Sequence, residues 1–397
     1  MKKIEVRDLT KIFGKHPKQG VRLLKEGKSK DEILKDTGMT VGVNRVSFDV
    51  EAGEVFVIMG LSGSGKSTLI RLVNRLIEPS NGTILIDGED ISKMDKKQLM
   101  ETRRKKLGMV FQNFGLFPHR TIQENTGYGL EVQKKDKSVI AEKSRQALEL
   151  VGLKGYEDQY PNQLSGGMQQ RVGLARALAN DPDILLMDEA FSALDPLIRK
   201  GMQDELLDLQ QKMQKTILFI THDLDEALKI GDRIALMKDG VIVQIGTPEE
   251  IMTNPADDYV EKFVEDVDRS KVFTAGNVMI RPETIQLGKA GPRVALQRMK
   301  QAGISSVYVT KNTNELYGIV TAEAAAEAIK NGVKDLNEIV DTNVPTVSED
   351  VALIDLFDKI HNTQIPMAVT EDGVLKGIIV RGAVLAALSR NEVKSDE

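Results

Sequence analysis

The chain of 397 residues contains no cysteine and no tryptophan. Without cysteine it can form neither disulfides nor thiolate metal sites, which fits a reducing compartment. Aromatic residues make up only 4% of the sequence. A hydrophobic core must therefore be built mainly from Leu, Ile, Val, Met and Ala.

Long apolar runs are also absent. None reaches the roughly 20 residues that a membrane-spanning helix needs, and Met1-Lys2-Lys3 leads into Ile4–Arg7 instead of the apolar core of a signal peptide. We therefore expect a cytoplasmic protein that works at a membrane only if a partner supplies the spans. The formal net charge of −5 argues against nucleic acid as a partner.

What is present is an α/β pattern. The length predicts roughly two or three domains, and in residues 1–265 short β-rich segments alternate with longer helical patterns, which predicts a mostly parallel sheet covered by helices. Three apolar runs are typical of strands buried on both faces: Val55–Met59, Ile184–Met187 and Ile217–Ile220. Because each run ends in polar residues, the strand ends should converge on one ligand site.

A phosphate-binding loop follows the first of these runs and precedes a helical pattern. It comprises Gly60, Leu61, Ser62, Gly63, Ser64, Gly65, Lys66, Ser67 and Thr68, which fit the consensus completely. The glycines let backbone N–H groups face phosphate oxygens, Lys66 can reach the β- and γ-phosphates of ATP, and Ser67 offers an oxygen to Mg²⁺. A glycine-rich turn without a ligand is the weaker interpretation.

The second run ends in two acids, Asp188 and Glu189. A strand that ends this way can present one carboxylate to a metal and the other to a water molecule. We assign Asp188 to Mg²⁺ and Glu189 to the attacking water. Alone the pair could be an ordinary strand end, but the phosphate-binding loop favours the catalytic assignment.

Residues 164–170 narrow the class of ATPase. The segment contains Leu164, Ser165, Gly166, Gly167 and Gln169 ahead of a helical pattern, so it can also form an anion-binding helix start. It resembles the signature motif of the ATP-binding-cassette (ABC) family. The resemblance implies a P-loop NTPase fold at residues 1–265, in which a RecA-like, mostly parallel sheet carries a helical subdomain. It also implies a homodimer in which two ATP molecules lie between two cassettes, each signature contacting the γ-phosphate on the opposite subunit.

Further positions match the same family. By that resemblance Gln112 contacts the metal and relays its state to a membrane subunit, Asp195 acts across the dimer, and His222 holds the γ-phosphate and orients the water. Family members stack adenine on an aromatic residue near the N-terminus, which here is Phe13. An insertion at about residues 15–40 could displace Phe13 and leave the stacking to aliphatic residues around Val43.

From about residue 273 the chain contains a weak repeat with a spacing of roughly 60 residues. Ser306–Val309 is followed by Leu316–Val320, just as Pro366–Val369 is followed by Leu375–Ile379. Each unit predicts a helix, two strands joined by a polar turn, and a second helix. This pattern resembles a tandem α+β pair of cystathionine-β-synthase (CBS) domains, which we place at residues 273–332 and 336–393.

CBS domains often bind adenine nucleotides, and those that hold a ribose typically show Gly-x-x-Thr-x-x-Asp. Here Gly318 and Thr321 are present but Ala324 replaces the acid, and the second repeat lacks both polar residues. We therefore expect cyclic di-AMP ahead of AMP or ATP, with a dimerisation module that binds no ligand as the alternative. Thr321 and His361 are the candidate regulatory residues.

The insertion, the cassette and the CBS pair together resemble the ATPase subunit of glycine betaine/proline betaine importers. The resemblance implies a peripheral location on the cytoplasmic face of the membrane. It also implies a membrane permease subunit with a fused or separate substrate-binding protein. The segment Asn113–Phe117 would contact that permease. Alternatives are the ATPase of an amino-acid or polyamine importer, a soluble ABC ATPase that transports nothing, or a nucleotide-sensing regulator.

The insertion itself is basic. Seven cations, Lys15, Lys18, Arg22, Lys25, Lys28, Lys30 and Lys35, are opposed only by Glu26, Asp31 and Glu32. The sequence predicts a helical hairpin in which Gly27 ends the first helix, Ser29–Glu32 caps the second, and Leu23, Leu24, Ile33 and Leu34 form small apolar faces. It could read ionic strength against an anionic lipid surface, or simply be a solvated charged face.

Overall fold

In a computed structural model of the chain, the described residues are 1–112, 114–265, 270, 272–311, 314–363 and 365–388. The chain divides into two compact units, Met1–Asp266 and Val267–Glu397. No helix among the described residues is both long and apolar enough to cross a membrane.

The first unit contains two sheets. The smaller one is antiparallel, with the strand order β2-β1-β4-β5, and its strands are β1 (Lys2–Phe13), β2 (Thr40–Glu51), β4 (Asn81–Ile86) and β5 (Glu89–Asp90). The larger one has the order β10-β9-β3-β8-β7-β6 and comprises β3 (Val55–Met59), β6 (Leu107–Val110), β7 (Ile184–Asp188), β8 (Thr216–Thr221), β9 (Arg233–Lys238) and β10 (Val241–Gly246). Only the β9–β10 pair of the larger sheet is antiparallel. The predicted mostly parallel sheet is thus confirmed.

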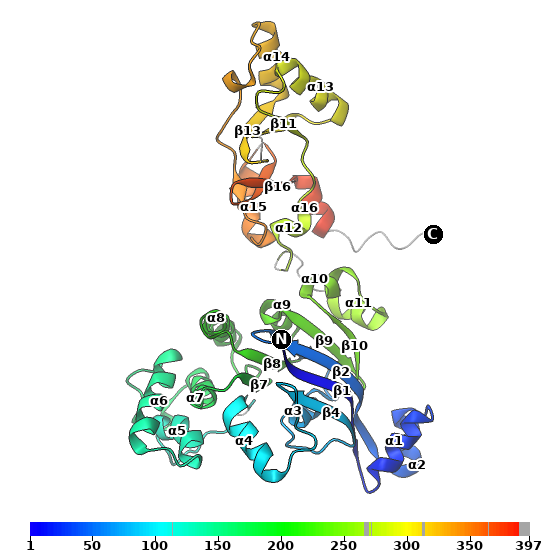
Figure 1. The fold of residues 1–397 in the computed structure, drawn as a ribbon, viewed down its shortest axis with the longest axis vertical. Helices are drawn as coiled ribbons and strands as arrows, with labels where there is room; N and C mark the ends of the chain where they lie inside the picture. Colours follow the sequence, from blue (N-terminus) through cyan, green and yellow to red (C-terminus); the bar gives the residue numbers. More distant parts are fainter. Residues whose placement is uncertain (113, 266–269, 271, 312–313, 364, 389–397) are drawn as a thin grey trace. The chain divides into compact units, whose positions relative to one another are not determined.

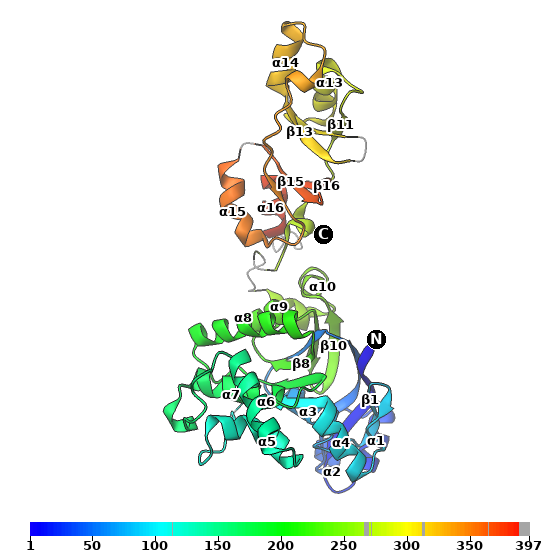
Figure 2. The same ribbon diagram turned by 60° about the vertical axis from the view of Figure 1, so that its left-hand side comes forward.

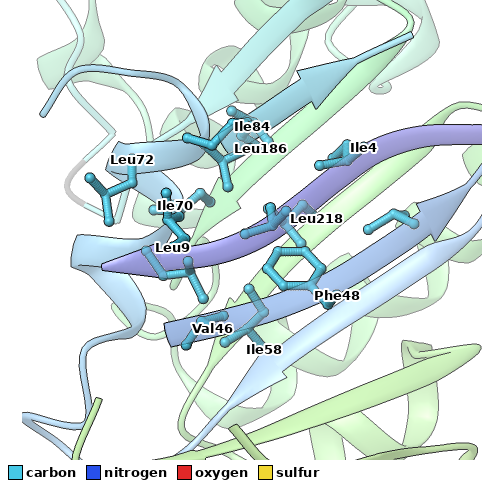
Figure 3. Packing of buried hydrophobic residues seen from close by; sticks show 14 of the residues in the cluster. Ile4, Leu9, Val46, Phe48, Ile58, Ile70, Leu72, Ile84, Leu186 and Leu218 are labelled. Atoms are coloured by element: carbon cyan, nitrogen blue, oxygen red, sulfur yellow. The ribbon is translucent and has the colours of Figure 1, made fainter. Parts of the chain in front are cut away.

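The three apolar runs are β3, β7 and β8, and every residue of these strands is buried. The main core lies between the two sheets and includes the inner face of the helix that follows β3 (Figure 3). Ile4 and Phe48 contribute from the antiparallel sheet, and Ile58, Leu186 and Leu218 from the parallel sheet. Packing on both sides fixes the carboxyl ends of the parallel strands, where the polar residues follow.

Helices cover the larger sheet and extend beyond it (Figures 1 and 2). The helices of the first unit are α1 (Pro17–Lys25), α2 (Lys30–Thr37), α3 (Lys66–Val73), α4 (Lys96–Lys106), α5 (Ile122–Val132), α6 (Lys137–Leu150), η1 (Pro161–Gln163), α7 (Gly166–Leu178), α8 (Pro196–Met213), α9 (Leu224–Ile230), α10 (Pro248–Thr253) and α11 (Asp258–Val264). The helices α5, α6 and α7 pack on one another and form the predicted helical subdomain.

The insertion forms the expected hairpin between β1 and β2. Ser29 and Glu32 make a capping box at the start of α2, and Gly27 adopts a φ of 90° after α1. Ile33 is buried with Ile12, and Leu23 packs against them. The prediction for Leu34 is wrong, because 49% of that residue is exposed. It follows Ile33 on a short helix and therefore points about 100° away from it.

The second unit repeats one topology. The sheet β11-β12-β13 and the sheet β14-β15-β16 each contain a parallel pair followed by an antiparallel pair. The elements are α12 (Ala275–Val278), β11 (Thr284–Gln286), α13 (Pro292–Ala302), β12 (Ser306–Thr310), β13 (Leu316–Thr321), α14 (Ala322–Lys330), η3 (Leu336–Glu338), β14 (Thr346–Val347), α15 (Leu353–Asn362), β15 (Met367–Glu371), β16 (Val374–Ile379) and α16 (Arg381–Leu388). The predicted helix-strand-strand-helix pattern is confirmed, and the short strands β11 and β14 are additions.

Side chains that precede or belong to the first repeat of this unit pack against the second repeat. Phe273 and Val278, which precede the first repeat's sheet, pack in the core of the second repeat with Leu356. Tyr308 of β12 is buried, and its hydroxyl donates a hydrogen bond to the carbonyl of Pro366. Burial raises the pKa of the Tyr308 phenol, so it remains a donor at physiological pH.

Candidate active site

The phosphate-binding loop joins β3 to α3. Gly60, Gly63 and Gly65 have φ values of 156°, 81° and 104°, which favour glycine at the latter two positions in particular. A Cβ atom on Gly60 would lie 2.2 Å from the carbonyl oxygen of Met237, and one on Gly65 would lie 2.4 Å from that of Gly42. Only glycine fits these two places, because both neighbours are backbone atoms.

Lys66 begins α3 and is buried. Its Nζ donates hydrogen bonds to the carbonyl oxygens of Gly60, at 2.7 Å, and Leu61, at 3.1 Å, and lies 3.9 Å from Oε1 of Glu189. Burial lowers the pKa of Lys66, while the carboxylates of Glu189 and Asp188 act in the opposite direction. The loop thus holds a lysine ammonium at the start of a helix, where the cation and the helix N-terminus both attract an anion.

Asp188 ends β7 and faces Ser67. The Ser67 hydroxyl donates to Oδ1 of Asp188 at 3.1 Å, and Oδ2 lies 3.9 Å from a guanidinium nitrogen of Arg71. Burial raises the pKa of Asp188, partly offset by the Ser67 hydrogen bond and the Arg71 charge. A second positive charge beside this carboxylate would relieve the cost of its burial.

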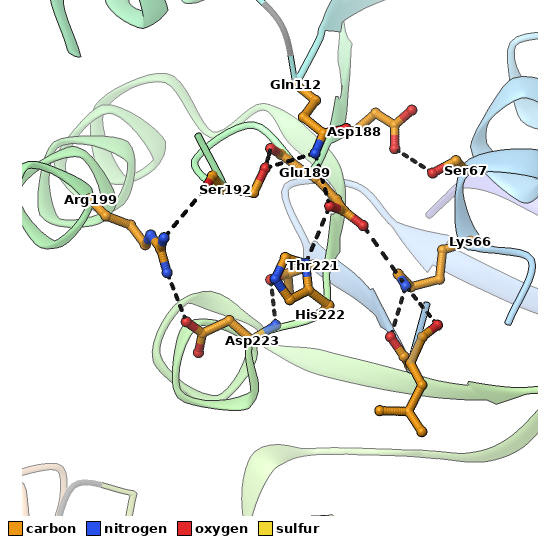
Figure 4. Close-up of polar contacts among 12 residues, drawn as sticks. Lys66, Ser67, Gln112, Asp188, Glu189, Ser192, Arg199, Thr221, His222 and Asp223 are labelled. Carbon is orange, nitrogen blue, oxygen red and sulfur yellow. Dashed lines mark hydrogen bonds and ion pairs between the residues drawn. The ribbon is translucent and has the colours of Figure 1, made fainter. Parts of the chain in front are cut away.

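Glu189 lies at the centre of the site and contacts several of its side chains (Figure 4). Its Oε2 lies 3.3 Å from Nε2 of Gln112 and 3.2 Å from Nδ1 of His222. Its backbone φ is 47°, a left-handed value that is uncommon for a non-glycine residue. The backbone at Glu189 is held by a hydrogen bond from its N–H to the carbonyl of Ile220 on β8. Three residues from separate segments therefore meet at the Glu189 carboxylate: Lys66, Gln112 and His222.

The site suits a magnesium–phosphate complex better than a bare metal ion. Among the described residues no group of three or more histidines, cysteines or acids could hold a metal, whereas one hydroxyl and one carboxylate, Ser67 and Asp188, already lie together. Mg²⁺ commonly takes one or two protein ligands and completes its shell with water and substrate phosphates. Ser64 Oγ is buried with no hydrogen-bond partner among the described residues, so its hydroxyl can donate to a phosphate oxygen held by the loop.

The signature residues lie elsewhere in the unit. The Ser165 side chain caps α7 by accepting from the Met168 N–H, and Ser165 and Gly166 are exposed. Leu164 is buried, and the Gln169 amide donates to the carbonyls of Pro161 and Leu164. Within the described part of the chain, no hydrogen bond or ion pair joins this segment to the phosphate-binding loop.

Asp195 and the adenine candidates have different environments. Asp195 is exposed at the start of α8, and its side chain makes no capping bond. Phe13 ends β1 opposite Thr40, so the insertion leaves it in the strand, and it is 39% exposed. Its ring lies close to Gly42, where a Cβ atom would be 2.8 Å from it. Val43 is fully buried, whereas the Phe13 ring is partly exposed.

The segment after Gln112 is fixed from two sides. Asn113 lies outside the described residues, and Phe114, Leu116 and Phe117 are half-buried. Arg176 of α7 donates to the carbonyls of Phe114, at 2.8 Å, and Gly115, at 2.5 Å. The buried Asn125 accepts from the Phe117 N–H at 2.7 Å and donates to the Phe117 carbonyl at 3.0 Å. The segment is thus tied to the helical subdomain.

The candidate regulatory residues are not brought together by any described contact. Thr321 caps α14 by accepting from the Ala324 N–H at 3.2 Å. His361 belongs to α15, and its side chain lies outside the described part.

Sequence reasoning did not anticipate the contacts that join the site's loops. Ser192 accepts from Gln112 at 3.2 Å and donates to the Glu189 carbonyl at 2.9 Å. Arg199 pairs with Asp223, the residue after His222. The only signal was position, since Arg199 lies one helical turn beyond Asp195 and Asp223 adjoins a candidate residue.

Comparison with known proteins identifies the families to which the two parts of the chain are similar. Residues 43–192 match the ABC transporter family, and residues 275–331 and 333–390 each match the CBS domain. The chain is 64% identical over 393 residues to the glycine betaine/carnitine transport ATP-binding protein GbuA of Listeria monocytogenes serotype 1/2a (strain 10403S), covering 99% of each chain. It is 62% identical over 390 residues to the glycine betaine transport ATP-binding protein OpuAA of Bacillus subtilis (strain 168), covering 98% of this chain and 93% of that one.

A solved structure extends the comparison to the fold. The dimeric post-hydrolysis state of the ATP-binding cassette MJ0796, bound to ADP and Pi, superposes with a TM-score of 0.52 at 31% identity, and the match covers 62% of this chain and 98% of that one. The chain therefore belongs to the ATP-binding proteins of ABC transporters, with a P-loop NTPase cassette followed by two CBS domains.

Proposed function

We propose that the chain is the ATP-hydrolysing subunit of an importer of glycine betaine or related quaternary-ammonium solutes. The observation that carries the hydrolysis is the meeting of Lys66, Gln112 and His222 at the Glu189 carboxylate. The identity of the solute is inferred from the relatives, two of which are named for glycine betaine transport. No residue of this site would touch the solute.

In the proposed reaction, the loop N–H groups and Lys66 bind the β- and γ-phosphates of ATP. Glu189 accepts a proton from the attacking water at its carboxylate, and His222, 3.2 Å from Oε2, orients that water and contacts the γ-phosphate. Phe13 stacks on adenine. Lys66 must leave the loop carbonyls to reach the phosphates, a change that substrate binding would drive.

Ser67, Asp188 and Gln112 would hold the Mg²⁺ that accompanies ATP. Bound there, the ion would neutralise charge on the phosphate oxygens. The Ser67–Asp188 hydrogen bond supports the assignment because it already places both oxygens at the end of β7.

The signature segment supports a two-chain site. It presents Ser165 and Gly166 at an exposed helix start, which can bind an anion, yet no described hydrogen bond or ion pair joins it to the chain's own phosphate-binding loop. We propose that it contacts the γ-phosphate bound by a second copy, with Leu164, Gly167 and Gln169 supporting it and Asp195 crossing the interface. The dimeric form of MJ0796 is consistent with this arrangement.

The segment 114–117 is the proposed contact with a membrane permease. Gln112 lies in the site, Phe114 and Leu116 are half-buried, and Arg176 links the segment to the signature helix. A change at the γ-phosphate would therefore reach an apolar docking surface.

Uptake of labelled glycine betaine tests the function. The full chain is reconstituted with its permease in vesicles, and labelled proline, carnitine, choline and a labelled polyamine are assayed in parallel. ATP-dependent accumulation that Glu189→Gln abolishes is the expected result. Uptake of an amino acid or polyamine instead of betaine would assign that compound as the solute. ATPase activity without any coupled uptake would favour a non-transport ATPase.

The CBS pair is proposed to regulate transport by binding an adenine-containing ligand, with cyclic di-AMP preferred. Thr321 is committed to capping α14 and Ala324 provides no carboxylate, so a ribose-binding acid is absent from the first repeat at this position. A dinucleotide between paired modules would need fewer such acids. Calorimetric titration of the full chain with cyclic di-AMP and AMP, with the cassette saturated with ADP, decides between them, and no heat from either leaves dimerisation as the role.

The basic hairpin is a proposed contact with anionic lipid. Arg22, Lys28 and Lys30 already pair with Glu26, Asp36 and Asp239, whereas no ion pair is described for Lys15, Lys18, Lys25 or Lys35. The latter four would carry the attraction to lipid, and salt would screen it.

A further inference from the structure

Arg199 connects two loops of the site, and none of its described hydrogen bonds goes to a residue assigned to the substrate. One guanidinium nitrogen donates to Oδ2 of Asp223 at 3.2 Å. The other donates to the carbonyl oxygens of Leu194, at 3.2 Å, and Ser192, at 3.4 Å. Figure 4 shows Arg199 between the loop that follows Glu189 and the turn that follows His222.

These contacts close a ring around Glu189. From the Glu189 carboxylate the ring passes through His222 to the adjacent Asp223, and then to Arg199. It returns through Ser192, which contacts both the Glu189 carbonyl and the Gln112 amide, and that amide meets the Glu189 carboxylate again. Arg199 thus joins the side of the ring that contains Asp223 to the side that contains Ser192.

A second contact between α8 and α9 lies one turn further along α8. Gln203 follows Arg199 by four residues, so both face the same way, and its amide donates to Oε1 of Glu226 at 3.0 Å. Gln203 and Glu226 are both buried. Asp223 also caps α9 by accepting from the Glu226 N–H at 3.1 Å. The start of α9, and with it His222, is therefore clamped to α8 at two places.

We propose that Arg199 is a positioning residue that holds His222 at the Glu189 carboxylate and couples that geometry to the Ser192–Asp195 loop. A planar guanidinium with several fixed donors can satisfy a carboxylate and two carbonyls at once, which a lysine ammonium on a flexible stem does poorly. Because Asp195 is exposed at the end of this loop, a shift of that loop on dimer formation would move Arg199 and so adjust His222. The inference rests on the proposed hydrolysis of ATP.

Steady-state ATPase kinetics of the full chain test the role. Arg199→Gln should lower kcat by about 10- to 100-fold, the scale of a small misplacement of catalytic groups, while KM for ATP changes much less. Asp223→Asn should lower kcat similarly, because asparagine still caps α9 but loses the ion pair. The double variant should be no slower than the worse single variant, since both changes remove the same Arg199–Asp223 ion pair. Arg199→Lys should lie in between.

Lys212→Gln is the matched control, because it removes a cation from an exposed position on the same helix and should leave kcat unchanged. A kcat for Arg199→Gln within twofold of the parent overturns the inference, as do losses that multiply in the double variant. If Arg199→Gln does not fold, Asp223→Asn and Arg199→Lys decide by the same criteria. Absence of ATPase activity in the parent chain would instead contradict the proposed function, independently of Arg199.

Discussion

His222 Nδ1 and Glu189 Oε2 lie 3.2 Å apart, so the ring of one residue and the carboxylate of the other can share a hydrogen bond at the end of two neighbouring parallel strands. The geometry places a proton acceptor beside a group that can orient its water. The first prediction tests the assignment of the base to Glu189 and of the orienting role to His222.

Glu189→Gln should keep ATP binding and lower kcat at least about 100-fold, because an amide cannot take up the proton of the attacking water. Binding of a fluorescent ATP analogue and steady-state phosphate release measure the two effects. Glu101→Gln, at an exposed position on α4, is the control. Turnover of Glu189→Gln within a few-fold of the parent would make His222 the leading base.

Asp188→Asn should stabilise the nucleotide-free cassette at neutral pH. Burial raises the pKa of Asp188, so the ionised form is disfavoured in the folded state relative to the unfolded one. This destabilisation is absent below the unfolded pKa and is fully present once the pH rises above the folded pKa. Removing the charge should therefore contribute about 1 kcal/mol, measured as a higher Tm at pH 7 that disappears in acid.

The same variant should lose the stabilisation that Mg-ATP gives the parent, because binding to the native state raises Tm only where affinity is retained. Thermal unfolding with and without Mg-ATP gives both values. A lower Tm of the nucleotide-free variant at pH 7, or an undiminished gain with Mg-ATP, would contradict the assignment of Asp188.

Phe13→Ala should weaken ATP binding about tenfold, in line with the 1–3 kcal/mol measured for stacking of a base on an aromatic ring. Phe13→Tyr should preserve the affinity, since tyrosine keeps the ring. The dissociation constant of ATP measures the effect, and Tyr156→Ala, an exposed aromatic far along the chain, serves as the control. Equal affinities for Phe13→Ala and the parent would remove Phe13 from the adenine site.

Replacing Lys15, Lys18, Lys25 and Lys35 by glutamine should shift the dependence of uptake on salt. With these four cations gone, for which no ion pair is described, attraction to anionic vesicles weakens, so transport should already be active at low internal salt. Uptake against internal salt is measured beside a control with Lys134, Lys135 and Lys137 changed to glutamine. An unchanged salt threshold would leave the hairpin as a solvated charged face.

Much of the fold could be predicted because its signals are local. The runs at β3, β7 and β8 are apolar throughout since both faces are buried, and the phosphate-binding loop lies where its consensus requires. The capping box at Ser29 and Glu32 also depends only on neighbours in sequence. Such features can be read from a short window.

The features that were missed depend on distant parts of the chain. Nothing near Arg199 in sequence indicates that Asp223 will be its partner, because the pairing follows from how α8 packs on α9. The same holds for Arg176 and the carbonyl of Phe114. The exposure of Leu34 shows the reverse error, since α2 packs through the face that carries Ile33, and the next residue points about 100° away from it.

Because the chain has no cysteine, a disulfide between two introduced thiols can test the shared-site arrangement directly. One chain carries Ser62→Cys in the exposed phosphate-binding loop and another carries Ser165→Cys in the exposed signature, both with Glu189→Gln to retain ATP. The two chains are mixed with Mg-ATP and oxidised, and the products are separated by mass.

The predicted result is a disulfide-linked dimer that contains one chain of each kind. It forms with Mg-ATP and is less abundant without Mg-ATP. No linked dimer from the mixture, together with a disulfide within a single chain that carries both substitutions, would contradict the account, because the signature would then serve the phosphate-binding loop of its own chain.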